Sequence, residues 1–372
     1  MKRVSLVQVG FGTVGGVLLE QVVSQHDRWC QELGLDIRIV GIAGRKGAIV
    51  ADNLEHGLHE AELRNLLALK RGEQGANPSP RALEPVLGAV HRICAVGEDH
   101  VAIVMDAAAG DETIDVLTTA LAKGAGVVLS NKSPLALPAS HAATRILWDA
   151  AAQGRLRYEA TCGAGLPVIS TLQGLLASGD RMLEVTGCLS GTLGAIFSMV
   201  AAGETFSEAV RDARARGYTE PDPRDDLSGL DVARKALILA RTMGIEIDLT
   251  DIDVHSLIPE GLSEVPVDEF LARINVEDGD IRAMAMKART DGASLKYVAE
   301  VVPNGVLVSS VGLSEVSTST MLGALQGPEN IISFRTERYD TYPLVIAGPG
   351  AGAQVTAAGM VTDMLAVVQR II

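Results

Sequence analysis

The chain has 372 residues, of which 47% are hydrophobic and 21% charged, a composition that fits a folded globular protein and excludes an intrinsically disordered one. This length is sufficient for two domains and a large buried core. The net charge of −14, with no dense run of Lys and Arg, argues against a nucleic-acid partner.

The sequence carries no signal for export or membrane insertion. The apolar run in the N-terminal MKRVSLVQVGFG is too short for a signal peptide, and no stretch has the roughly 18 uninterrupted apolar residues of a membrane span. The four cysteines are scattered singly, without a CxxC pair. We therefore expect a cytoplasmic protein with reduced cysteines and no membrane partner.

The first half of the chain alternates strands and helices. Apolar runs predict strands over 4–9, 37–43, 101–106 and 127–130, and helical spacing predicts helices over 13–24, 60–70 and 113–123. A loop rich in Gly, Pro and Asn covers 72–80. Aromatic residues make up only 3% of the chain, so the core consists of smaller aliphatic side chains. The pattern predicts an α/β fold with a doubly wound parallel (Rossmann) sheet.

After about Gly154 the alternation is lost. Strands are expected over 156–161, 182–189, 295–302 and 306–311, with helices over 165–177, 206–215 and 228–243 between them. The chain ends in a glycine turn and a long apolar helix, which we expect to pack on the first domain. We therefore predict a dinucleotide-binding domain over 1–155, completed by 345–372, and an α+β domain for substrate binding and dimerisation over 156–344.

A glycine-rich turn follows the first strand and opens the first helix. Its residues are Gly10, Phe11, Gly12, Thr13, Val14 and Gly15. Such a turn lets the backbone approach a pyrophosphate and directs a helix N-terminus at its charge. Glycines at this spacing are weak evidence alone, but in a strand–helix context at the start of a βαβ series they favour dinucleotide binding over a structural turn.

The end of the second expected strand bears on the choice of cofactor. An acidic residue there would bind the ribose 2′-hydroxyl of NAD, but the chain has Arg45 and Lys46 instead. Two cations favour the 2′-phosphate of NADP. The alternative is that both are loop side chains that make no contact with a cofactor.

Two further motifs leave alternatives open. Lys132, in Ser-Asn-Lys-Ser-Pro, follows a strand at the edge of the sheet where ligands bind, and either contacts substrate or nicotinamide ribose or faces solvent. The segment 187–196, with the hydroxyls of Ser190 and Thr192, either holds a substrate carboxylate or is a turn between a strand and a helix.

Glu159 precedes a glycine-rich bend in Tyr-Glu-Ala-Thr-Cys-Gly-Ala-Gly-Leu-Pro. Its carboxylate and the carbonyls of the bend could surround a hard cation such as Na⁺. The residues alone favour a hinge between domains.

The segment 217–235, GYTEPDPRDDLSGLDVARK, concentrates carboxylates ahead of a lysine-bearing helix. Asp231 and Lys235 lie one helical turn apart and share a face. An exposed pair of this kind is worth only tenths of a kcal/mol, but the rest of the helix is apolar. An acid-rich loop beside it needs a cationic partner, which is either the amino group of a small zwitterionic substrate or Lys235. We expect Asp231 to position Lys235 without fully pairing with it.

With these motifs in this order, the chain from Val4 onward resembles the homoserine dehydrogenase family. The segments GFGTVG, NKSP, YEATCGAGLP, LSGTL, 217–235 and AGPGAGAQVTAAG carry the resemblance. It implies a homodimer that catalyses NAD(P)-dependent interconversion of homoserine and aspartate 4-semialdehyde. It also implies that Lys235 donates or accepts the proton and that Lys132 lies where nicotinamide and substrate meet. The residues expected to bind substrate or support its loop are Asp231, Glu220, Asp226, Gly191 and Thr192.

The same resemblance implies further ligand contacts. Glu159 and the carbonyls of Cys162, Ala164 and Leu166 match a monovalent-cation site for Na⁺ or K⁺, which displaces the hinge interpretation. Cofactor contacts are implied at Thr13, Val14, Ala108, Ser130 and Gly352. The chain departs from the family at Ala107–Ala109, where many members have hydroxyl residues, and at Cys162, where valine is usual. Neither an aspartokinase domain nor a C-terminal regulatory domain is expected.

Two alternatives share the glycine turn. A related NADP-dependent dehydrogenase of another amino-acid semialdehyde need not carry the segment from Glu220 to Lys235. A non-enzymatic NADP sensor would lack the lysine and its acids, which this chain retains.

Overall fold

The computed structural model describes residues 1–70, 80–96, 100–304 and 306–371. The expected loop over 72–80 lies outside these ranges except for Pro80. The chain divides into two compact units. Unit 1 comprises Met1–Gly165 with Ala351–Ile372, and unit 2 comprises Leu166–Gly350.

Unit 1 contains the doubly wound sheet predicted from the first half of the chain. Its strand order is β3-β2-β1-β4-β5-β6, and all neighbours are parallel except β2 and β3. The strands are β1 (Lys2–Val9), β2 (Leu35–Gly44), β3 (Gly47–Val50), β4 (His100–Asp106), β5 (Gly126–Leu129) and β6 (Leu156–Arg157). Because β1 pairs with β2 on one side and β4 on the other, ligands are expected at the carboxyl ends of β1 and β4.

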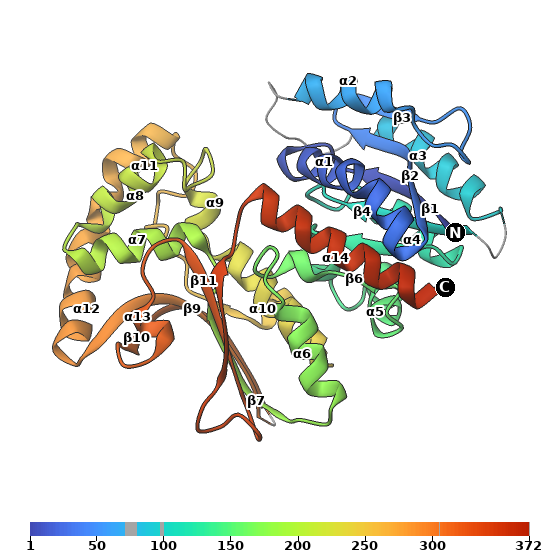
Figure 1. Cartoon of the computed structure of the whole chain (residues 1–372). Helices are drawn as coiled ribbons and strands as arrows, with labels where there is room; N and C mark the ends of the chain where they lie inside the picture. The colour runs from blue at the N-terminus through green and yellow to red at the C-terminus, as the bar shows by residue number, and fades with distance from the viewer. Residues whose placement is uncertain (71–79, 97–99, 305, 372) are drawn as a thin grey trace. The chain divides into compact units, whose positions relative to one another are not determined.

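Helices of unit 1 cover this sheet (Figure 1). They are α1 (Thr13–Arg28), α2 (Glu60–Lys70), α3 (Pro80–Ile93), α4 (Ile114–Ala122), α5 (Ala142–Ala152) and α14 (Ala353–Ile371), with short turns η1 (Trp29–Leu33), η2 (Ser133–Ala136) and η3 (Glu159–Thr161). Helix α14 packs against α1 and β5, and its Met360, Met364 and Val367 are fully buried in the core around β1 and β4. Burial of each such side chain contributes about 1.5–3 kcal/mol.

The expected strand over 156–161 is wrong in extent and in sheet. Leu156 and Arg157 pair with β5 and complete the sheet of unit 1, whereas Glu159–Thr161 forms a 3₁₀ turn. The strand ends because Tyr158 leaves the extended conformation, with φ −150° and ψ 29°. The sequence analysis also did not assign α5, the helix that connects β5 to β6.

Unit 2 is an α+β unit built on a second sheet, of order β12-β11-β7-β9-β10-β8. Its strands are β7 (Met182–Cys188), β8 (Asp253–Val254), β9 (Ala293–Asn304), β10 (Val306–Ser317), β11 (Glu329–Thr336) and β12 (Leu344–Pro349). All neighbours are antiparallel except β8 and β10. Strands β11 and β12 were not predicted.

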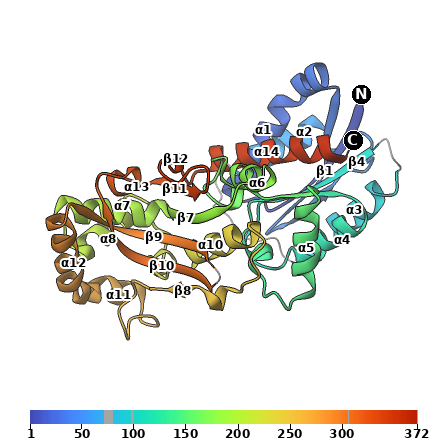
Figure 2. The same ribbon diagram turned by 90° about the horizontal axis from the view of Figure 1, so that it is seen from below.

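The helices of unit 2 include the three that were predicted over 165–177, 206–215 and 228–243. The full set is α6 (Val168–Ala177), α7 (Gly191–Ala202), α8 (Phe206–Ala215), α9 (Arg224–Leu227), α10 (Leu230–Thr242), α11 (Val267–Arg273), α12 (Asp278–Thr290) and α13 (Met321–Ala324), with turns η4 (Leu249–Asp251) and η5 (Ile274–Glu277). Helices α7, α10 and α12 pack on β9 (Figure 2).

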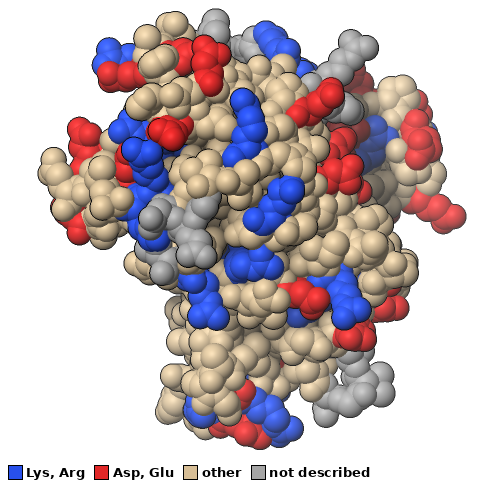
Figure 3. Space-filling view, turned by 90° about the vertical axis from the view of Figure 1, so that its right-hand side faces the viewer, with Lys and Arg blue, Asp and Glu red and all other residues tan. Residues whose placement is uncertain are grey.

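The surface mixes charges of both signs. On the face shown in Figure 3, Lys and Arg side chains lie singly or in small groups with Asp and Glu among them and uncharged areas between. Among the described residues, no helix combines the length and the apolar character needed to cross a membrane.

Candidate functional site

The glycine turn of unit 1 is closely packed against the backbone of the sheet. Gly10 has φ +90°, and a Cβ atom there would lie 2.4 Å from the backbone nitrogen of Ala108. A Cβ atom on Gly15 would lie 2.2 Å from the carbonyl oxygen of Gly10. The side chain of Gln8 donates hydrogen bonds to the carbonyls of Gly10 (3.0 Å) and Gly15 (2.7 Å). Only glycine fits at these two positions, so the turn has one defined shape.

This turn leaves the N-terminus of α1 suited to an anion. The residue before the helix is Gly12, which offers no side-chain cap, and the first turn carries no acidic residue. Backbone N–H groups at such a terminus and the helix dipole favour a phosphate. The residues present therefore fit the pyrophosphate of a dinucleotide.

Asp106 ties together the loops at the carboxyl edge of the sheet. Its fully buried carboxylate accepts hydrogen bonds from the backbone N–H of Ala108 (2.9 Å), Thr113 Oγ1 (2.7 Å) and Asn131 Nδ2 (3.1 Å). Burial raises the pKa of Asp106, and these three hydrogen bonds oppose the rise. The sequence analysis missed this network, although Asn131 lay within a motif that it singled out.

The same network positions Ser130 and Lys132. The backbone N–H of Ser130 donates to the carbonyl of Asp106 (3.0 Å). Lys132 is half-buried and precedes η2, where Asn131 Oδ1 accepts from the backbone N–H of Ser133 (3.1 Å). Both residues thus follow β5 at the edge of the sheet that carries the glycine turn.

Arg45 and Lys46 form the tip of the hairpin between β2 and β3, and both are exposed. Gly44 pairs with Gly47 below this tip, and a Cβ atom on Gly44 would lie 3.1 Å from Phe11 Cβ. The hairpin therefore begins beside the glycine turn, with no acidic residue at the end of β2.

Gly352 lies in the turn that leads into α14 and has φ +123°. Its carbonyl accepts hydrogen bonds from the backbone N–H (3.0 Å) and Oγ1 (2.8 Å) of Thr356. The side chain of Gln21, on α1, donates to the carbonyl of Gln354 (3.0 Å). This turn is thereby fixed relative to α1.

The bend that follows Glu159 is held by α14. Glu159 is 6% exposed, and its backbone N–H donates to Asp363 Oδ2 at 2.7 Å. Burial, together with the nearby charge of Glu159, raises the pKa of Asp363 to about 7. Gly163 and Ala164 both have left-handed φ, at +86° and +55°. Cys162 and Ala164 are buried in unit 1, and Leu166 is the first residue of unit 2.

In unit 2, hydrogen bonds made by Arg224 hold the acid-rich segment 217–235 in place. Arg224 donates to both carboxylate oxygens of Asp222, with a shortest distance of 2.6 Å. It also donates to the carbonyls of Ser263 and Val265, both at 2.7 Å. Its guanidinium lies 5.4 Å from the ring centre of Phe270. Arg224 therefore neutralises one of the five acids and anchors the loop, a role that the sequence analysis did not assign.

Asp226 joins this loop to the start of α7. It accepts a hydrogen bond from the backbone N–H of Glu220 at 2.9 Å. Thr192 Oγ1, which donates to the carbonyl of Tyr218 at 2.6 Å, lies beside the same carboxylate. Burial raises the pKa of Asp226, with further contributions from the charges of Glu220 and Asp231. Glu220 lies in the same loop and is exposed to solvent.

Lys235 is the buried cation of this cluster. It is 7% exposed, and its Nζ atom lies 2.7 Å from Asp231 Oδ2 and 2.6 Å from the carbonyl oxygen of Leu189. The expectation that Asp231 would not fully pair with Lys235 is wrong for this structure. A buried ammonium needs a nearby anion, and the side chain of Asp231 one turn earlier can supply it while staying 45% exposed.

The structure thus gathers Lys235, Asp231, Asp226, Glu220, Thr192 and the neighbouring Gly191 in unit 2, whereas the expected cofactor residues and Lys132 lie in unit 1. The Leu189 carbonyl, at the end of β7, had no sequence signal because its role depends on backbone geometry. The segment 187–196 is the turn into α7, with Ser190 Oγ accepting from the backbone N–H of Leu193 at 3.2 Å.

The fold and these groups define a dinucleotide-binding α/β protein with a buried lysine–carboxylate cluster on a second sheet. The sequence model of the homoserine dehydrogenase family matches residues 167–365. Homoserine dehydrogenase of Schizosaccharomyces pombe is 34% identical, with 99% of this chain and 96% of the relative covered. The chain belongs to the homoserine dehydrogenase family.

Other similar proteins differ in length or are similar in fold. Bifunctional aspartokinase/homoserine dehydrogenase 2 of Arabidopsis thaliana is 38% identical over 96% of this chain, which spans only 38% of that relative. A crystal structure of a Candida auris protein of unknown function has a TM-score of 0.84 at 28% identity, covering 100% and 99% of the two chains. A hyperthermophilic archaeal homoserine dehydrogenase in complex with NADPH has a TM-score of 0.68 at 24% identity, covering 99% and 98%.

Proposed function

We propose that this chain is an NAD(P)-dependent oxidoreductase that interconverts L-homoserine and L-aspartate 4-semialdehyde. The observation that carries the proposal is the buried Nζ of Lys235, held by Asp231 and the Leu189 carbonyl beside the acid-rich loop. The membership of the family and the name of the S. pombe relative support this choice of substrate.

The residues of unit 2 suggest how the reaction proceeds. Reduction of the aldehyde adds a hydride to the carbonyl carbon and a proton to its oxygen, and we assign the proton donor to the ammonium of Lys235. In the reverse direction, the neutral amine accepts the proton of the hydroxyl group. Asp231 and the Leu189 carbonyl fix the position of Nζ, which places the proton along one direction.

The remaining polar groups would orient the substrate. The carboxylate of Glu220 would bind the substrate's ammonium, and Asp226 holds the Glu220 loop through its backbone N–H. The first turn of α7, which begins at Gly191 and carries Thr192, would receive the substrate's carboxylate, since helix N-termini favour anions.

In unit 1 we propose that the glycine turn, Ala108, Ser130, Lys132 and Gly352 contact the dinucleotide, whose nicotinamide supplies or accepts the hydride. Arg45 at the tip of the β2–β3 hairpin would bind the 2′-phosphate of NADP. The absence of an acid at the end of β2 and the archaeal complex with NADPH support this preference.

We also propose a monovalent cation at Glu159 and the carbonyls of Cys162, Ala164 and Leu166. Its support is the burial of Glu159 next to a second buried carboxyl group, that of Asp363, since a cation would offset the charge of a buried carboxylate. Activity that is unchanged by Na⁺ and K⁺ in an otherwise metal-free buffer would contradict this assignment.

A homodimer through the second sheet is a further proposal. Thr186, Glu300, Ser310 and Ser333 form one row across four strands, according to the strand register, and all four are half-exposed. The opposite face, with Val185, Val301 and Phe334, is buried. Light scattering of the purified protein should give twice the chain mass, and a monomer at assay concentrations would contradict the proposal.

The function is tested by following NADPH absorbance with aspartate 4-semialdehyde and, in reverse, NADP⁺ reduction with homoserine. Turnover of both substrates is expected, with glutamate 5-semialdehyde as the control substrate. Preference for the control would indicate a related semialdehyde dehydrogenase. NADPH binding without turnover of either aldehyde would indicate a sensor instead.

A further inference from the structure

His26, Cys30 and Asp36 form a cluster in unit 1 far from the glycine turn. His26 lies in the last turn of α1, whereas the glycine turn lies at the first residue of that helix. A helix of 16 residues is about 24 Å long. Asp36 likewise lies near the amino end of β2 and Arg45 just past its other end. The cluster therefore belongs to neither of the sites proposed above.

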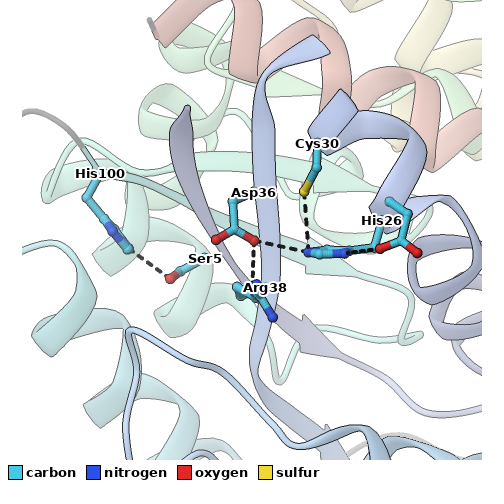
Figure 4. Close-up of polar contacts among 7 residues, drawn as sticks. Ser5, His26, Cys30, Asp36, Arg38 and His100 are labelled. Carbon is cyan, nitrogen blue, oxygen red and sulfur yellow. Dashed lines mark hydrogen bonds and ion pairs between the residues drawn. The ribbon is translucent and has the colours of Figure 1, made fainter. Parts of the chain in front are cut away.

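The side-chain atoms of this cluster converge on one point (Figure 4). His26 Nε2 lies 3.0 Å from Asp36 Oδ1 and 3.7 Å from Cys30 Sγ, and all three atoms lie within 4.8 Å of one another. Bond lengths of about 2.0–2.3 Å to tetrahedral Zn²⁺ correspond to separations of roughly 3.3–3.7 Å between ligand atoms. Side-chain movements of well under 1.5 Å would thus complete three corners of such a site.

The local backbone explains why these three groups meet. After Arg28 the helix widens into the π-helical turn η1, in which Trp29 is buried and anchors the turn. Cys30, four residues after His26, then points to the same side. Gly34, with φ +66°, reverses the chain into β2 and brings Asp36 back beside them.

The groups around the cluster resemble the outer partners of a metal site. His26 Nδ1 lies 3.3 Å from Asp27 Oδ1. Without a metal, Nε2 carries the proton that it shares with Asp36. With a metal bound, that proton would leave, the proton on Nδ1 would face Asp27, and Nε2 would be the ligand atom, as in many metal-bound histidines. Arg38 Nε donates to Asp36 Oδ1 at 2.5 Å, the same oxygen that faces His26. It orients that carboxylate, and Oδ1 would exchange this hydrogen bond for the metal or leave the ligand position to Oδ2. Burial would raise the pKa of Asp36, but the hydrogen bonds from His26 and Arg38 hold the pKa below its ordinary value.

The same geometry does not suit a nucleophilic cysteine. A Cys–His–acid triad uses one ring nitrogen for the thiol and the other for the acid, but Cys30 and the well-placed Asp36 both face Nε2.

We propose that His26, Cys30 and Asp36 bind a divalent transition metal, with Zn²⁺ the ion that suits this mixed ligand set. One thiolate and one carboxylate would match the charge of the ion. Water would occupy the fourth position. His26 and Cys30 are half-exposed, so the ion can enter from solvent. The metal would join the end of α1 to the start of β2 and so stabilise unit 1.

The test uses the full-length chain without a histidine tag, after treatment with a chelator, and Co²⁺ as a spectroscopic probe. A thiolate-to-cobalt absorption band that saturates at one equivalent per chain and is abolished by Zn²⁺ is expected. Cys30→Ser should remove the band, whereas Cys94→Ser, at another half-exposed cysteine of unit 1, should retain it. No saturable thiolate band, or a band that persists in Cys30→Ser, would overturn the proposal.

Zinc affinity provides an independent measurement. His26→Gln and Asp36→Asn should weaken binding by more than the roughly 10–100-fold typical of lost outer partners, and Asp27→Asn by about that factor. His100→Gln, at a histidine bonded instead to Ser5, should bind as the parent does. Equal affinity in the His26 and His100 variants would show that binding is non-specific and would reject the site.

A measurement on the unsubstituted protein remains valid even if the variants fail to fold. Zn²⁺ should slow alkylation of Cys30, mapped by mass spectrometry, and leave that of Cys94 unchanged. Equal rates at Cys30 with and without saturating Zn²⁺ would overturn the proposal. None of these readouts requires homoserine turnover, so they stand apart from the proposed function.

Discussion

Replacement of Lys235 by methionine separates its chemical role from its structural one. Methionine keeps most of the apolar stem and removes the ammonium. The Leu189 carbonyl then loses its donor at 2.6 Å, at a cost of about 1–3 kcal/mol in the free energy of unfolding. Asp231 is 45% exposed at its side chain and can be hydrated, so no buried charge is left without a partner.

Lys296 supplies a matched control within the same unit. It is 4% exposed, and its Nζ donates to the carbonyl of Leu325 at 2.5 Å, but it lies outside the proposed cluster. Lys296→Met therefore has a similar expected cost in stability. Lys235→Met should lower kcat by roughly 10²–10⁴, the usual contribution of an acid–base group, whereas Lys296→Met should keep kcat near that of the parent.

The assay follows NADPH oxidation with aspartate 4-semialdehyde, and urea unfolding confirms that the two variants are comparably stable. NADPH affinity, measured by fluorescence, should be unchanged in both because the proposed cofactor residues lie in unit 1. Turnover of Lys235→Met within tenfold of the parent would refute the reasoning. The proton would then come from Lys132 or a water molecule, and the 217–235 segment would serve binding alone.

Three other predictions concern single groups. Arg45→Ala should weaken NADP binding by about tenfold or more and leave NAD binding nearly unchanged, and equal losses in calorimetric titrations would contradict the assignment to the 2′-phosphate. Glu220→Ala should raise KM for homoserine with a smaller change in kcat, and an unchanged KM would argue against an ammonium contact. Because the pKa of Asp363 rises from 3.8 to about 7 on folding, the folded state retains a proton that the unfolded state releases. The free energy of unfolding should therefore fall as pH rises between these values, and Asp363→Asn should flatten the slope measured by urea unfolding. An unchanged slope would show that other groups cause it.

The parallel sheet of unit 1 was predictable because each strand was a continuous apolar run followed by a helix. Lengths and boundaries were less predictable. The short strand Leu156–Arg157 was assigned to the wrong sheet, since two paired residues carry no periodicity and only the crossover through α5 determines their neighbour. Strand β11 pairs with β7, which is far away in the sequence, and local patterns do not encode that pairing. Strand β12 pairs with β11 alone, so its place in the sheet depends on the same distant contact.

The contacts of the proposed site were likewise predictable where they are local in the sequence and were missed where they are not. Spacing along one helix was sufficient to place Asp231 beside Lys235. It could not show the Leu189 carbonyl, which is 46 residues away in the chain. Nor could it show that Arg224 binds both Asp222 and the carbonyls of a later loop. Asp106 escaped notice because its importance arises from burial and from the loop that brings Asn131 to it.

The position of α14 has a consequence for the order of folding during synthesis. Unit 1 begins at Met1 but is completed by residues 351–372, after the whole of unit 2. The contact between Gln21 and Gln354 spans 333 positions, and Ala357, Met360 and Met364 are fully buried. While the ribosome translates unit 2, the nascent sheet of unit 1 therefore lacks one of its covering helices and exposes apolar surface to chaperones. All strands of unit 2 are translated before α14, although the synthesis of unit 2 starts later, so unit 2 needs no later segment of the chain to complete its sheet.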